Sequence, residues 1–153
     1  MKPIMQFLYR ARRLLLRLTG WKTRGVKVMV FNQAGELLLV RHSYGRSDLF
    51  LLPGGGIEAR ETPAAAAHRE LREEVGLSTD ELKPFATYCS TSEGRKDEVH
   101  LFTATTTGVP KADGVELEDA CFFPLGALPK KVSPATLRRI AEYRGEKPVS
   151  PRW

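Results

Sequence analysis

Between Gly55 and Leu77 the chain reads GGIEARETPAAAAHRELREEVGL, and no other segment of the sequence is as informative. Its middle predicts a helix, because Thr62 is suited to the N-cap, Pro63 to the first helical position and Gly76 to the end. Apolar residues three or four positions apart are expected to form the buried stripe of this helix: Ala64, Ala67, Leu71 and Val75. The segment therefore indicates a loop followed by a capped helix.

Three glutamates of this helix stand at positions i, i+3 and i+4, namely Glu70, Glu73 and Glu74. At this spacing the carboxylates share one helix face, within about 100° of arc, where like charges destabilise the helix. Mg²⁺ would offset the repulsion, because it binds carboxylate oxygens and is commonly shared with substrate phosphates. The plainer interpretation is a solvated acidic face. The preceding glycine loop, Glu61 and Arg69 favour the catalytic interpretation.

Two neighbours of the glutamates bear on this choice. Arg69 stands four residues before Glu73, so its planar guanidinium is expected to orient that carboxylate. The loop before the helix contains three consecutive glycines, Gly54 to Gly56, which allow the backbone to approach a ligand closely and to adopt positive φ. The alternative for the loop is an ordinary flexible turn.

The whole segment resembles the signature of the Nudix hydrolase family, G-x5-E-x7-R-E-U-x-E-E-x-G-U, in which U is an aliphatic residue. Every defined position is filled at the required spacing: Gly55, Glu61, Arg69, Glu70, Leu71, Glu73, Glu74, Gly76 and Leu77. The resemblance implies an α/β fold, the Nudix α/β/α sandwich with a mixed, curved sheet between helices.

The resemblance also implies roles for individual residues. In the family, a backbone carbonyl of the glycine loop and the second and third glutamates of the helix motif bind the metal. Here these groups belong to Gly54, Glu73 and Glu74. Glu70 is then the base or a further metal ligand, and Glu61 acts through water or by holding the loop. The implied metal is Mg²⁺, with Mn²⁺ as the other candidate.

The sequence departs from many members at two positions. Phe50 stands where they have tryptophan, which keeps the apolar packing but loses the indole N–H. Arg60 stands where they have glycine. If the backbone there still needs positive φ, Arg60 is strained; otherwise the loop is rerouted and Arg60 reaches a substrate phosphate.

Substrate contacts are expected from the loop and from the end of the second strand. Arg41, with His42 and Arg46 beside it, is suited to bidentate phosphate binding, although exposed loop cations are an equally good interpretation. The candidate substrate-binding residues are Gly54, Gly55, Arg41 and Arg60. Some relatives use a downstream acid as a further ligand or base, and the candidates here are Glu98, Glu116 and Glu118, although such acids are more often plain surface residues. Trp21, Tyr88 and Phe102 are able to stack a base, although aromatic residues of strands are more often core residues.

Strands are expected in the β-rich runs outside this segment: Val26–Phe31, Glu36–Val40, Phe85–Ser90, Val99–Thr107 and Ala120–Phe123. A last helix is expected from Pro134 to Arg144. We expect three parts in the chain: residues 1–24 as a basic amphipathic N-terminal helix, residues 25–145 as the Nudix hydrolase domain, and residues 146–153 as an irregular tail.

The formal net charge of +6 belongs mainly to the N-terminal segment, where seven basic residues and no acid precede residue 25. Three roles are considered for its helix. The first role, which we favour, is that the helix packs on the domain or in a homodimer, because an exposed apolar stripe promotes aggregation of a soluble protein. The alternatives are that it lies on an anionic membrane surface or that it contacts RNA.

Composition narrows the class of protein. The chain has 153 residues, enough for one domain, and no apolar run long enough to span a bilayer. Its two cysteines, Cys89 and Cys121, lie in strand-like runs and are interpreted as buried core thiols. A reducing cytoplasm is the expected location.

The predicted protein is a Mg²⁺-dependent Nudix pyrophosphohydrolase. It cleaves the diphosphate linkage of a small nucleotide, a nucleoside diphosphate derivative, by attack of metal-activated water. One alternative is an RNA 5′-end pyrophosphohydrolase, suggested by the basic N-terminal segment. Another is a non-catalytic nucleotide-binding sensor on the same fold, which the complete glutamate set argues against.

Overall fold

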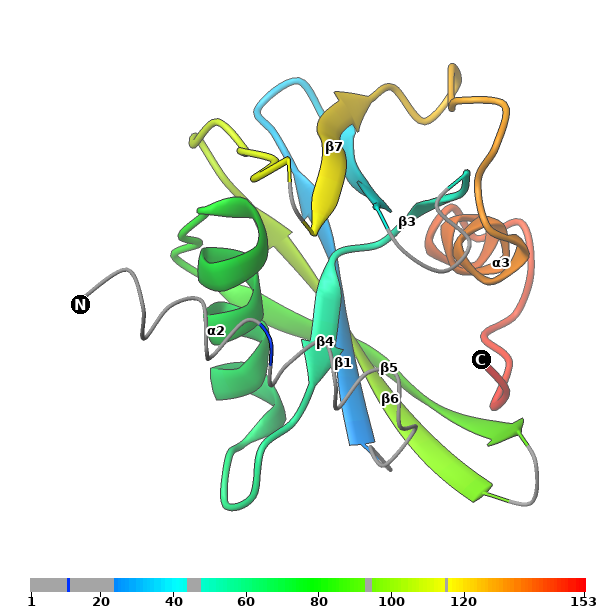
Figure 1. Cartoon of the computed structure of the whole chain (residues 1–153). Helices are drawn as coiled ribbons and strands as arrows, with labels where there is room; N and C mark the ends of the chain where they lie inside the picture. The colour runs from blue at the N-terminus through cyan, green and yellow to red at the C-terminus, as the bar shows by residue number, and fades with distance from the viewer. Residues whose placement is uncertain (1–10, 12–23, 44–47, 93–94, 115) are drawn as a thin grey trace.

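The computed structural model describes residue 11 and residues 24–43, 48–92, 95–114 and 116–153. These residues form a mixed sheet with one helix on each face (Figure 1). The strands are β1 (Arg24–Phe31), β2 (Leu37–His42), β3 (Phe50–Leu51), β4 (Gly54–Gly56), β5 (Leu82–Ser92), β6 (Arg95–Thr105) and β7 (Leu117–Phe123). The helices are α2 (Pro63–Val75) and α3 (Pro134–Tyr143).

The sheet is mixed because β1 runs parallel to β6, whereas the other strand pairs are antiparallel. Its main order is β3-β2-β1-β6-β5, with β4 paired to β1 and β7 paired to β2. The expected α/β/α sandwich with a mixed sheet is therefore confirmed. The expected N-terminal helix lies outside the described residues, apart from Ala11.

Alternation along β1 divides the core into two layers. Val26, Val28 and Val30 point to the α2 side, where they pack with Leu71 and Val75. Met29 and Phe31 point to the other side and pack in a cluster that contains Ile140 of α3. Successive strand side chains face opposite ways, so the part of β1 that is covered on both faces, from Val28 to Phe31, is apolar throughout.

The helix boundaries agree with the cap chemistry of the sequence. Thr62 accepts a hydrogen bond from the Ala65 N–H at 3.2 Å, Pro63 begins α2, and Gly76 ends it with φ of 68°. Among the described residues, no helix is both long enough and apolar enough to cross a bilayer.

Two expectations about burial are wrong. Ala64 is exposed, and the buried stripe of α2 instead includes Ala66 and the two glutamates Glu70 and Glu74. Cys89 and Cys121 are both exposed free thiols. Cys89 follows the fully buried Tyr88, so strand alternation turns its side chain outward. Cys121 lies on β7, for which the described strands offer one partner, β2.

Candidate active site

The glycine loop is held against β1 by the short strand β4. Gly54 pairs with Lys27, and a Cβ built on Gly54 would lie 2.1 Å from the carbonyl oxygen of Val26. Its φ of 149° is also one that residues with side chains rarely adopt. The close approach made by Gly54 is therefore an approach to the protein's own backbone.

Gly55 faces the acidic helix directly. A Cβ on this residue would lie 2.3 Å from the carboxylate carbon of Glu70, a residue with no exposed surface. Glu70 thus lies immediately beneath the loop, and the loop can cover it because residue 55 has no side chain.

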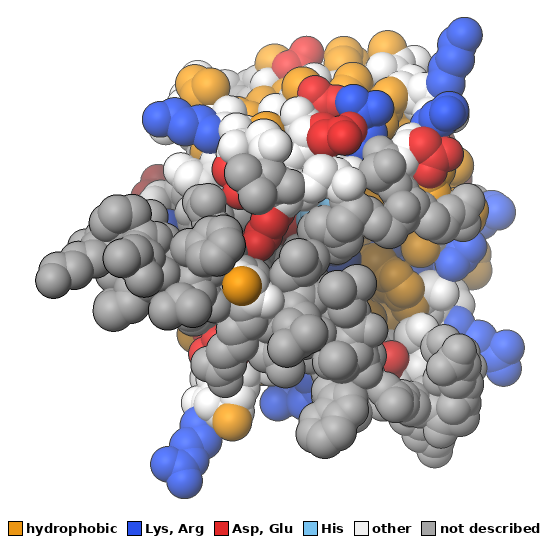
Figure 2. Space-filling model, in the orientation of Figure 1, with side chains coloured by type: hydrophobic (Ala, Val, Ile, Leu, Met, Phe, Trp, Pro, Cys, Tyr) orange, Lys and Arg blue, Asp and Glu red, His pale blue; other side chains and the backbone are white. Residues whose placement is uncertain are grey.

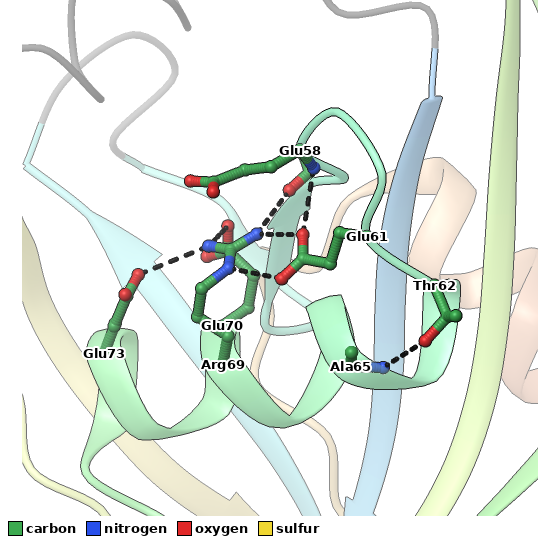
Figure 3. Close-up of polar contacts among 8 residues, drawn as sticks. Glu58, Glu61, Thr62, Ala65, Arg69, Glu70 and Glu73 are labelled. Atoms are coloured by element: carbon green, nitrogen blue, oxygen red, sulfur yellow. Dashed lines mark hydrogen bonds and ion pairs between the residues drawn. The ribbon is translucent and has the colours of Figure 1, made fainter.

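Arg69 connects the loop, the start of α2 and the acidic face (Figure 3). Its Nε and Nη2 donate to the two carboxylate oxygens of Glu61 at 2.7 and 2.8 Å, and Nη2 also donates to the Gly56 carbonyl at 2.9 Å. Nη1 lies 3.0 Å from Glu70 Oε1 and 3.3 Å from Glu73 Oε2. The hydrogen bond to Glu61, together with the nearby Glu70 charge, raises the pKa of Arg69, although burial opposes this.

The expected contact of Arg69 with Glu73 is present, but the paired donors of Arg69 are used elsewhere. The Nε–Nη2 edge of its guanidinium donates to Glu61, and the contact with Glu73 is the longest of the set. Glu61 in turn accepts a hydrogen bond from the Glu58 N–H at 2.9 Å. Glu61 therefore holds the loop, which is one of the two roles expected for it.

Glu74 is buried on the other side of the acidic face. Its Oε2 accepts a hydrogen bond from the Gly54 N–H at 2.8 Å, and its Oε1 lies 3.6 Å from His42 Nε2. The side chain of Glu74 is 2% exposed, against 27% for Glu73. The three helix glutamates thus divide into two buried carboxylates and one that faces solvent.

Arg60 adopts φ of 64° and is exposed. Of the two alternatives for this position, the backbone keeps the positive φ that glycine prefers, and Arg60 occupies it at a conformational cost. Its exposed side chain lies in the turn that precedes Glu61.

Arg41 is placed differently from the expected phosphate-binding cation. Its guanidinium forms ion pairs with Asp119 and, at 3.5 Å, with Glu118 on β7, and it lies 5.6 Å from the Phe50 ring centroid. Phe50 also packs edge-on against Phe123, as its apolar role required. Arg46 lies outside the described residues.

The weaker candidates have other partners or positions. Glu98 forms an ion pair with His100 on the same strand, β6. Tyr88 and Phe102 are buried in the two core clusters, which is the plainer of the two interpretations, and Trp21 lies outside the described residues.

A cavity of about 410 Å³ lies beside the glycine loop on the α3 side of the sheet. Its lining residues come from β1, β2, residues 49–52, the start of α3 and the C-terminal tail, and they include Lys27, His42, Leu51, Leu52, Pro134 and Trp153. His42 also contacts Glu74, and the Leu52 carbonyl accepts a hydrogen bond from Lys27 Nζ at 2.9 Å. The cavity is therefore a neighbour of the acidic cluster, with mostly apolar walls and few polar groups, as binding pockets commonly are.

Sequence reasoning did not find Lys27 and Trp153. Lys27 is a charged residue between Val26 and Val28 in the interior of β1, which is the signal that marks it. Trp153 has no such local signal, because it is brought to the cavity by packing of the tail.

A glycine loop placed over a helix with buried glutamates, on an α/β/α sandwich, defines the class of the Nudix hydrolases. The family model described as NUDIX domain matches residues 21–143. The chain belongs to the Nudix family, and it is an enzyme of the pyrophosphohydrolase class.

Individual relatives agree with this assignment. The chain is 33% identical over 125 residues, 80% of each chain, to a Bacillus subtilis (strain 168) protein provisionally named 8-oxo-dGTP diphosphatase. It is 43% identical over 61 residues to the RNA pyrophosphohydrolase of Stutzerimonas stutzeri (strain A1501), covering 40% of this chain and 37% of that protein. The fold is similar to the MutT NUDIX hydrolase of Burkholderia pseudomallei, with TM-score 0.70 and 21% identity, covering 78% of this chain and 95% of that one.

Members of the family typically use a divalent metal, and the donor set here fits one by its chemistry. Glu70, Glu73 and Glu74 offer carboxylate oxygens on one helix face, beside the backbone of Gly54. Three carboxylates, those of Glu61, Glu70 and Glu73, also share the guanidinium of Arg69. In the part of the chain that the structure describes, no three His, Cys, Asp or Glu side chains already converge into a metal site. Among the three helix glutamates, Glu73 has the most exposed side chain, at 27%, and therefore the most freedom to turn.

Proposed function

We propose that this enzyme is a Mg²⁺- or Mn²⁺-dependent hydrolase that cleaves the diphosphate linkage of a nucleoside diphosphate derivative with water. The observation that carries the proposal is the burial of Glu70 and Glu74 directly beside the glycine loop. Ionised carboxylates are costly to bury without a compensating cation. The burial of these two carboxylates beside the loop therefore favours a cation-binding role over a solvated acidic face.

Glu70, Glu73, Glu74 and the carbonyl of Gly54 would hold the metal. When bound, the metal supplies an activated water and offsets charge on the phosphates. The chain's own groups keep the cluster in place: the Gly54 N–H orients Glu74, and Arg69 orients Glu70 and fixes Glu61 to the loop. Although its backbone keeps the strained φ, we also assign Arg60 to the phosphates, because its side chain is exposed in the turn between the glycine loop and Glu61.

The test is a panel of nucleotides with product analysis, run on the full chain and on Glu74→Gln. Mg²⁺ or Mn²⁺ should support turnover, EDTA should abolish it, and Glu74→Gln should lower kcat by at least about 10²-fold. Glu81→Gln, an exposed acid outside the cluster, is the matched control and should retain full activity. Turnover by a metal-free sample, or wild-type kcat in Glu74→Gln, would show the proposed metal role to be wrong.

A second candidate is hydrolysis at the 5′ end of RNA, which the named RNA pyrophosphohydrolase relatives favour. That match covers 61 residues and little more than a third of the relative. On the face shown in Figure 2, the Lys and Arg side chains of the described residues lie mostly toward the rim and do not merge into one patch. If the enzyme acts on RNA, it should hydrolyse a 5′-triphosphorylated oligonucleotide, and that activity should fall steeply as the salt concentration rises. The rate of hydrolysis of a small nucleotide should depend much less on salt.

A further inference from the structure

One wall of the cavity beside the glycine loop comes from Trp153, far from the Nudix segment in the sequence. The indole is partly exposed and packs against the α3-side core. Figure 1 shows the chain returning after α3 to end near β5 and β6. The residues after α3 thus reach the same sheet face as the cavity.

Trp153 is held in place through both its backbone and its ring. Its N–H donates to the Cys89 carbonyl at 3.1 Å, while the Cys89 N–H donates to the Pro151 carbonyl at 2.8 Å. The indole meets the Tyr88 ring edge-on, with centroids 5.4 Å apart. The tail therefore joins β5 much as a short additional strand does, which fixes where the indole stands.

Arg139 supports the indole from α3. Its guanidinium has no exposed surface and lies 5.1 Å from the Trp153 ring centroid and 4.1 Å from that of Tyr88. It also donates to Glu142 at 2.9 Å and to the Arg152 carbonyl at 3.1 Å. A buried arginine is tolerated when it is paired in this way, and both rings gain a cation–π contact.

We propose that Trp153 is a specificity-determining residue of the substrate site, where its indole is the aromatic wall against which the planar base of a nucleotide packs. Arg139 is a positioning residue that holds this wall. The inference rests on the proposed function, since it places the phosphates at the acidic cluster, whose member Glu74 contacts His42 of the cavity wall. An aromatic wall suits a base because stacking needs only a π-face and few hydrogen bonds.

Steady-state kinetics with dGTP and with 2-deoxyribose 5-triphosphate, which lacks the base, provide the first test. Trp153→Ala should raise KM for dGTP by about tenfold and leave kcat within about twofold. It should leave both constants unchanged for the base-free compound. Trp153→Phe should retain most of the affinity for dGTP. Arg139→Lys should raise KM for dGTP in the same way as Trp153→Ala, but by less. Val149→Ala changes a half-exposed residue of the tail and is the control.

If Trp153→Ala folds poorly, nucleotide binding can be measured instead on a protein that keeps Trp153. The chain has two tryptophans, so Trp21→Phe leaves Trp153 as the single reporter. We expect dGTP to quench its fluorescence and 2-deoxyribose 5-triphosphate not to. Quenching without hydrolysis would support this inference while contradicting the proposed function. Hydrolysis of dGTP with no quenching, or equal KM changes for both compounds, would overturn the inference alone.

Discussion

A Cβ on Gly55 would stand 2.3 Å from the Glu70 carboxylate, so the carboxylate occupies the volume that any side chain would need. Either the loop or Glu70 must move when residue 55 is changed. Because Glu70 is fully buried, it has no solvent-filled space into which to move.

Gly55→Ala should therefore lower kcat by at least about tenfold, since displacing a reacting group by a fraction of an ångström is costly. Unfolding free energy should fall by about 1–3 kcal/mol, the usual cost of overpacking. Gly126→Ala is the matched control, because its Cβ would meet no atom within 4 Å. Kinetics and urea unfolding measure both effects, and wild-type kcat in Gly55→Ala would contradict the placement of Glu70.

At Gly55 a glycine is required, whereas at Arg60 a residue with a long side chain stands where the backbone favours glycine. Its φ of 64° suits glycine, yet a long side chain occupies it. Arg60→Gly should stabilise the fold by up to about 1 kcal/mol, because the strain is relieved. The neighbouring exposed Ala59→Gly should instead destabilise it, since glycine there only adds freedom to the unfolded chain.

Thermal melts of Arg60→Gly and Ala59→Gly give the comparison for stability. If Arg60 contacts phosphate as proposed, Arg60→Gly also raises KM while kcat changes little. If Arg60→Gly has both the stability and the KM of the wild type, then Arg60 is neither strained nor in contact with phosphate.

At the scale of elements, the loop and α2 behave as one unit because Arg69 joins them. One guanidinium contacts the Gly56 carbonyl, the Glu61 carboxylate and two glutamates of α2. A lysine would keep the charge but not the planar set of donors.

Arg69→Lys should lower kcat by about tenfold or more and the free energy of unfolding by about 1–2 kcal/mol, because buried acceptors lose their donors. Arg72→Lys, exposed on the same helix, should change the free energy of unfolding by less than about 0.5 kcal/mol. Equal effects of the two substitutions, in kinetics and urea unfolding, would show that the planar geometry of Arg69 is unimportant.

At the scale of the whole molecule, a buried polar network joins β5, α3 and the tail. Glu142 accepts hydrogen bonds from Tyr88 at 2.7 Å, from Arg139 at 2.9 Å and from the Ser150 N–H at 2.9 Å. Burial alone would raise the pKa of Glu142, but these donors outweigh it, so its pKa lies below the ordinary value of 4.5. Burial and the bond to Glu142 raise the pKa of Tyr88, which stays a donor.

A carboxyl whose pKa is lowered by folding stabilises the protein above its unfolded value and loses that contribution as the pH falls through its folded value. Glu142→Gln should thus be less stable than wild type at pH 7. The difference should shrink as the pH falls below about 4.5. Melting temperatures across that range measure it, with the exposed Glu146→Gln as control. A difference that is constant with pH would mean that the charge of Glu142 contributes nothing.

The sequence by itself determined the fold family, the boundaries of α2 and the identity of the acidic face. These features are local, because caps and i, i+3 and i+4 spacing depend only on neighbours along the chain. Even there it mistook Ala64 for a buried residue, since which side of a helix is covered depends on how it docks.

Only the tertiary structure decided the partners of the long polar side chains and the walls of the cavity. The Nε–Nη2 edge of Arg69 donates to Glu61 because the loop folds back over the helix, and Arg41 pairs with Asp119, 78 positions away in the chain. Lys27 and Trp153 meet at one cavity from opposite ends of the described chain. Such contacts follow from strand register and from which elements pack on which face, and no spacing along the sequence records either.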